Sequence, residues 1–111
     1  MLPRPQRITR EKEFNEIYRT GRYVNNRFFQ TKYIKNSLTE NRYGIVISNK
    51  ISKLAVVRNK LRRQIRAILA GQKTAVKGFD ILLIVKKEAL AAGFDRLEQA
   101  VKQVLAAIGL V

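Results

Sequence analysis

The pattern of apolar and polar residues divides the chain into segments of two different periods. Spacings of three and four residues, typical of helices that bury one face, predict helices over about residues 10–20, 53–69 and 94–108. Thr9 is placed to cap the first helix and Gly21 to end it. The apolar positions that define the three faces are Phe14, Ile17 and Tyr18, then Leu54, Val57, Leu61, Ile65 and Ile68, and finally Leu97, Val101, Val104, Leu105 and Ile108.

Shorter stretches rich in β-branched and aromatic residues predict strands. Residues 22–35 indicate a strand broken or bulged near the Asn-Asn pair at 25–26, and residues 42–48 a central strand. Residues 79–85 are so short and continuously apolar that they predict a strand buried on both faces or nearly so. The order is αββαβα, or αβββαβα if the broken strand counts twice. We expect one α+β domain over residues 1–111, an α+β or split β-α-β sandwich with helices against one face of a small mixed sheet.

The charge of the chain indicates what type of partner it binds. The chain has 23 Lys and Arg against 8 Asp and Glu, a formal net charge of +15, and residues 41–79 contain ten basic residues and no acidic one. Such a chain attracts a polyanion. An anionic membrane surface would favour a basic amphipathic helix with bulky exposed apolar residues, so nucleic acid is the preferred partner. No apolar run is long enough for a membrane span or a secretory signal. The absence of cysteine fits a reducing compartment, so we expect a cytoplasmic protein, with residues 1–6 disordered in the absence of its nucleic-acid partner.

The composition also limits the chemistry of the side chains. Cysteine and histidine are absent, so disulfides and the usual zinc and iron sites are excluded. The acidic cluster Glu11, Glu13 and Glu16 is explained most simply as charge at a helix N-terminus. We therefore expect no catalytic residue, no metal-binding residue and no cofactor held by protein side chains.

One helical segment concentrates the basic residues. On a helix, RNKLRRQIR at 58–66 places Arg58, Asn59, Arg62, Arg63 and Arg66 within about 140° of one another, opposite the apolar stripe. Guanidinium groups bind phosphates bidentately, and the asparagine can both donate and accept. Many charged helix faces are only solvated surfaces. Here the absence of acidic residues excludes pairing within the helix and favours a polyanion site.

This motif resembles a known family signature. The segment AVVRNKLRRQIR at 55–66 is similar to the arginine-rich RNR motif of the bacterial ribonuclease P protein, whose pattern is close to AVxRNxxKRxxR. The flanking segments GIVISNKIS at 44–52 and KGFDILLIVKKEA at 77–89 agree, as does RITREKEFNEIYRTG at 7–21. The resemblance covers nearly the whole chain, although SNKISKL is one residue longer than the commonest pattern.

The resemblance implies a fold and two RNA-binding surfaces. The fold is ribosomal protein S5 domain 2-like, with a left-handed β-α-β crossover that general topology rules disfavour. The first surface is the RNR helix with its preceding loop, and the second is a cleft between the first helix and the sheet that takes the 5′ leader of precursor tRNA. The implied residues are Arg58, Asn59, Lys60, Arg62, Arg63 and Arg66 on the helix, Lys50 and Lys53 in the loop, and Phe14, Tyr18, Gln30 and Lys32 in the cleft.

Two of these assignments have alternatives in the residues themselves. Phe14 and Tyr18, with the helical spacing of a core face, are equally consistent with core packing, although bases stack well on aromatic rings. In residues 27–35 both faces carry aromatics, so a one-residue bulge would exchange them. We place Gln30 and Lys32 on the cleft side.

The function implied is that of a protein subunit. Ribonuclease P hydrolyses one phosphodiester of precursor tRNA to give the mature 5′ end, the RNA subunit with Mg²⁺ carries the chemistry, and one protein is expected per RNA. A stand-alone RNA-binding or ribosomal-type protein with no enzymatic partner is the first alternative, because composition does not exclude it. A nuclease acting alone is the second, and it would require clustered carboxylates.

Overall fold

The computed structural model describes residue 5 and residues 7–110 of the chain. The expected order αβββαβα is confirmed, with a short 3-10 helix added before the last helix. None of the helices in this described part is long and apolar enough to cross a membrane. In chain order the elements are α1 (Glu11–Thr20), β1 (Arg22–Asn25), β2 (Phe29–Lys35), β3 (Arg42–Val46), α2 (Ala55–Ala70), β4 (Phe79–Val85), the 3-10 helix η2 (Lys87–Ala91) and α3 (Phe94–Ile108).

The four strands form one mixed sheet in the order β1-β2-β4-β3. β1 pairs with β2 and β2 with β4 in antiparallel fashion, whereas β3 and β4 are parallel. The crossover through α2 therefore joins two adjacent strands, so the alternative of a split β-α-β arrangement is wrong. The left-handed sense of this crossover stays a prediction from the resemblance.

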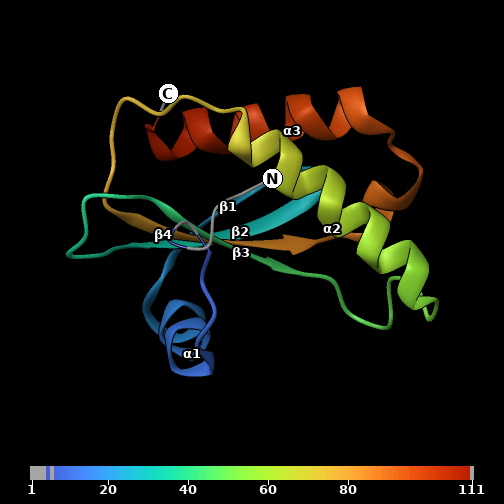
Figure 1. Ribbon diagram of the computed structural model, residues 1–111, viewed down its shortest axis with the longest axis horizontal. Coiled ribbons are helices and arrows are strands. Elements are labelled where there is room, and N and C mark those ends of the chain that lie inside the picture. Colours follow the sequence, from blue (N-terminus) through green and yellow to red (C-terminus); the bar gives the residue numbers. More distant parts are fainter. Residues whose placement is uncertain (1–4, 6, 111) are drawn as a thin grey trace.

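The helices cover both faces of the sheet, which corrects the expectation of helices on one face. In Figure 1, α2 and α3 lie on one side of the sheet and α1 on the other. The alternation of β4 reflects this: Ile81, Leu83 and Val85 pack in the core under α2 and α3. Leu82 and Ile84 pack in the smaller core under α1. The predicted burial of this strand on both faces is thus confirmed.

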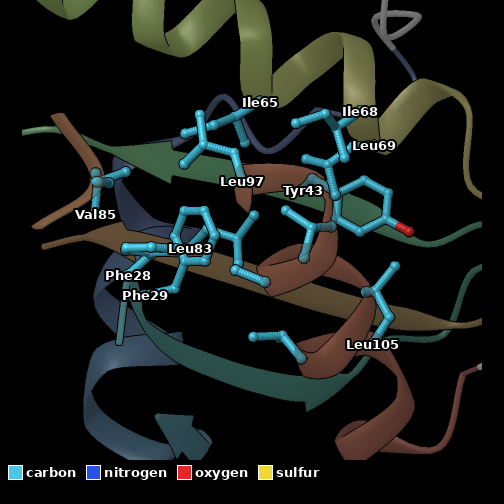
Figure 2. Close-up of a cluster of buried hydrophobic side chains, with 14 of the residues drawn as sticks. Phe28, Phe29, Tyr43, Ile65, Ile68, Leu69, Leu83, Val85, Leu97 and Leu105 are labelled. Carbon is cyan, nitrogen blue, oxygen red and sulfur yellow. The ribbon is translucent and has the colours of Figure 1, made fainter. Parts of the chain in front are cut away.

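The larger core lies between the sheet and the two C-terminal helices. Figure 2 shows Ile65, Ile68 and Leu69 of α2 directed toward Tyr43 and Leu83 of the sheet. Each such fully buried apolar side chain stabilises the fold by about 1.5–3 kcal/mol. This burial fixes the rotation of α2 about its own axis and so decides which of its residues reach solvent.

The helix ends differ in detail from the sequence prediction. α1 begins at Glu11 with Arg10 at the N-cap and no side-chain cap, so Thr9 does not cap it. The cause is the preceding backbone, because Ile8 N–H donates to Tyr43 O at 2.9 Å and holds this segment against β3. Leu54, predicted to be buried, is 62% exposed, because it is the extended N-cap residue of α2 and lies outside the helical period.

The disorder expected at residues 1–6 concerns positions that lie, except for residue 5, outside the described part.

The predicted break in the first strand is a hairpin corner built on Asn26. Its Oδ1 accepts hydrogen bonds from the N–H groups of Phe28 and Phe29, and its Nδ2 donates to the carbonyl of Ala100 in α3. As a result both phenylalanines are buried in the larger core. This corner also sets the faces of β2, since Phe29 at its start faces α2 and α3.

Candidate nucleic-acid interface

The basic residues of α2 form a row along the border of its buried stripe. Leu61, Ile65, Ile68 and Leu69 are buried against the core. Arg58, Arg62 and Arg66, one turn apart, are half-buried beside that stripe rather than opposite it. The outward side carries the exposed residues Asn59, Lys60 and Arg63. The predicted polar face therefore exists, but three of its arginines lie close to the body of the protein.

Hydrogen bonds orient the first half of this row. Arg58 Nη1 donates to the Ser52 carbonyl at 2.7 Å, which ties the helix to its preceding loop. Arg62 Nη1 donates to Asn59 Oδ1 at 3.2 Å. In that loop Lys50 and Lys53 are exposed, so they extend the basic surface beyond the helix N-terminus. The arginines thus present their remaining N–H donors in partly fixed directions, which lowers the entropy cost of binding a phosphate.

At the second half of the row, burial and neighbouring positive charges both act on Arg66. Partial burial, and then the positive charges of Arg7 and Arg62, lower the pKa of the Arg66 guanidinium. Arg7 was missed from the sequence, because it comes close to Arg66 only through the pairing of residues 7 and 43. In the sequence, the polar Arg7 followed by the apolar Ile8 was the signal that could have indicated an extended segment at these residues.

The four residues that the resemblance assigns to a cleft lie on the α1 side of the sheet. Lys32 Nζ donates to the Tyr18 carbonyl at 3.1 Å and lies 5.1 Å from the centroid of the Tyr18 ring. Gln30 is exposed and shares a face with Lys32 two residues away on β2. The Tyr18 side chain is 41% exposed, whereas Phe14 is half-buried and packs against the smaller core. The structure therefore groups Tyr18, Gln30 and Lys32 at the surface and gives Phe14 a packing role beside them.

An ion-pair network that the sequence analysis missed holds α1 onto this face. Arg42 of β3 donates to both carboxylate oxygens of Asp80, at 2.9 and 2.6 Å, and pairs with Glu13 of α1 at 2.7 Å. Asn36 Nδ2 donates to Asp80 Oδ1 at 2.8 Å. Hydrogen bonding to Asp80 raises the pKa of Arg42 above its usual value. The signal in the sequence was Asp80 itself, a charge inside an apolar strand that required a partner.

What these surfaces can do is bind an anion over an extended area. Among the described residues, no three His, Cys, Asp or Glu side chains gather into a possible metal site. Asp80 and Glu13 are both engaged by Arg42. The ion pairs in the described part use Arg42 and Lys102, which leaves the arginines of α2 outside them.

Comparison with known proteins agrees with this geometry. A sequence model of the family described as Ribonuclease P matches residues 2–109. The ribonuclease P protein component of Streptococcus agalactiae is 34% identical over 110 residues, which is 99% of this chain and 100% of that protein. The protein component of Thermotoga maritima is 36% identical over 96 residues, 86% of this chain and 80% of that protein.

Solved structures give the same result for the fold. The ribonuclease P protein of Staphylococcus aureus superposes with a TM-score of 0.86 at 29% identity, covering 95% of this chain and 96% of that one. The ribonuclease P protein of Thermotoga maritima superposes with a TM-score of 0.73 at 31% identity, covering 92% and 93%. By its sequence over nearly its whole length, and by its fold, this chain belongs to the ribonuclease P protein family, the protein components of a ribonucleoprotein endoribonuclease that processes the tRNA 5′ end.

Proposed function

We propose that this chain binds the catalytic RNA of ribonuclease P through α2 and its preceding loop, and the 5′ leader of precursor tRNA through the face under α1. The observation that carries the proposal is the row Arg58, Arg62 and Arg66, which borders the core outside the ion pairs of the described residues. Asn59, Lys60, Arg63, Lys50 and Lys53 extend the same surface. Phosphate contacts of this kind supply binding energy that is independent of base sequence.

The leader is a single strand, which suits the second surface. Unpaired bases stack on aromatic rings and their phosphates pair with nearby cations, and Tyr18 with Lys32 supplies both groups. Gln30, exposed on the same face, adds hydrogen-bonding capacity. Phe14 supports the proposed surface by packing between α1 and the sheet rather than by full exposure. This surface would thus bind the leader with little preference for its base sequence.

In this proposal the protein contributes binding and the RNA contributes chemistry. Hydrolysis in the holoenzyme requires Mg²⁺, which we place on RNA phosphates, because the carboxylates of Glu13 and Asp80 are already paired with Arg42. Neutralised phosphates allow the two RNAs to approach and hold metal ions where they meet. We further propose one protein per RNA and a cytoplasmic complex. The alternative of a stand-alone RNA-binding protein has less support, because the relatives named above are components of an enzyme.

The test is the affinity for ribonuclease P RNA and its salt dependence. The variant Arg62→Ala with Arg66→Ala should weaken binding and reduce the slope of log K against log salt by about one per lost phosphate contact. A matched variant, Arg96→Ala with Lys102→Ala, removes two charges from exposed positions of α3 and should change both quantities less. Equal losses in the two variants, or equal affinity of the wild-type protein for an unrelated structured RNA, would contradict the proposal.

A further inference from the structure

The N-terminal segment brings an arginine to the edge of the sheet beside α2. Arg7 forms a parallel bridge with Tyr43, and Ile8 N–H donates to the Tyr43 carbonyl. Ile8 packs in the smaller core with Ile17 and Leu82, on the α1 side. Because neighbouring side chains of an extended segment point to opposite faces, Arg7 points to the face that α2 covers.

One nitrogen of the Arg7 guanidinium is buried without a hydrogen-bond partner in the described part of the chain. Its Nε is buried, and within the described residues no group accepts a hydrogen bond from it. A buried donor of this kind destabilises the free protein and is rare in native structures, so it requires a physical reason.

A second cation lies near enough to Arg7 for the two charges to interact. Arg66 is half-buried at the border of α2, and after burial the charge of Arg7 is the largest cause that lowers its pKa. Arg62, one turn earlier, contributes in the same direction. Like charges in one place repel one another in the free protein, and a bound anion offsets that repulsion.

We propose that Arg7 and Arg66 together form a binding site for one phosphate group of an RNA backbone, with Arg62 at its margin. Guanidinium groups donate pairs of N–H bonds to phosphate oxygens, and the Arg7 Nε–H is a donor that already lies out of water with no protein acceptor among the described residues. The inference rests on the proposed RNA-binding function and extends that interface from α2 across to the sheet edge.

The first test separates a binding role from a structural role for Arg7. In Arg7→Gln the affinity for ribonuclease P RNA should fall about tenfold, the effect of losing a charge-assisted contact, while the melting temperature of the RNA-free protein stays equal or rises. Arg10→Gln, which removes the same charge from an exposed position three residues away, should change neither quantity as much. A lower melting temperature with unchanged RNA affinity would show that Arg7 is structural and overturn the site.

The second test asks whether the two arginines share one phosphate. Arg66→Gln should weaken RNA binding, and Arg7→Gln combined with it should weaken binding by less than the product of the single effects, because both contact one group. Effects that multiply would mean separate contacts and overturn the shared site.

A third measurement decides the site independently of ribonuclease P RNA. Inorganic phosphate titrated into the RNA-free wild-type protein should shift the Nε–H NMR signals of Arg7 and Arg66 and leave that of Arg10 in place. If wild-type protein shows no preference for ribonuclease P RNA but these signals shift, the proposed function fails and the phosphate site stands. If the preference is present but the signals do not move, the site fails and the proposed function stands.

Discussion

Replacement of Arg42 by methionine tests the network that fixes α1 on the sheet. Methionine keeps an apolar stem but removes both bonds to Asp80 and the pair with Glu13. The side chain of Asp80 is only 6% exposed, so its charge would be left with the single bond from Asn36. Removing one partner of a buried pair costs about 3–5 kcal/mol, and because the Arg42 side chain is 19% exposed we expect the lower end, about 3 kcal/mol.

The assay is urea unfolding followed by circular dichroism, together with the melting temperature. A loss of about 3 kcal/mol corresponds to about 12 °C for a chain of this size. Lys102→Met is the control, because the Lys102–Glu98 pair is a 3.9 Å surface pair with side chains 57% and 38% exposed and should cost about 0.5 kcal/mol or less.

A second variant tests the reason for the loss. Asp80→Asn added to Arg42→Met should recover about 1 kcal/mol, because a buried amide is less costly than an unpaired carboxylate. If Arg42→Met unfolds at the same urea concentration as Lys102→Met, or if the added substitution recovers nothing, the network does not hold α1 as described.

Three further substitutions test the packing and the second surface. Gly44→Ala would place a Cβ 2.8 Å from Phe14 Cε1, so we expect a loss of about 1–3 kcal/mol in urea unfolding and a partial recovery when Phe14→Leu is added. Asn26→Ala removes three hydrogen bonds of the hairpin corner and should cost about 2–3 kcal/mol by the same measurement, an unchanged midpoint being the contrary result. Tyr18→Ala should weaken binding of precursor tRNA about tenfold in the complex with ribonuclease P RNA, with no effect on mature tRNA; equal effects on both would exclude a leader contact.

The sequence predicted those features that depend on local period. The three helices follow from the spacing of apolar residues, the strand buried on both faces from a short continuous apolar run, and the break from the Asn-Asn pair at 25–26. The period of the apolar residues shows that one face of a helix is buried, but not which side of the sheet that face packs against. The placement of α1 opposite α2 and α3 was therefore predicted wrongly from the pattern.

The candidate sites were predictable to different degrees for the same reason. The basic residues of α2 lie on one helix, so their grouping needed only helical geometry. The charge of Arg7 comes within range of Arg66, and Arg42 pairs with Asp80 and Glu13, because segments distant in the sequence pack together, and no local pattern encodes that packing. The half-burial of Arg58, Arg62 and Arg66 likewise depends on how far the helix is rotated over the sheet.

The most direct test of the central claim is cleavage of precursor tRNA at physiological Mg²⁺ and moderate salt. The reaction is run with the protein alone, with a bacterial ribonuclease P RNA alone, and with both. We predict efficient cleavage only in the mixture, and a weaker effect when the protein carries Arg62→Ala with Arg66→Ala. Cleavage by the protein alone, or no stimulation of the RNA by the protein, would contradict the assignment of an accessory subunit.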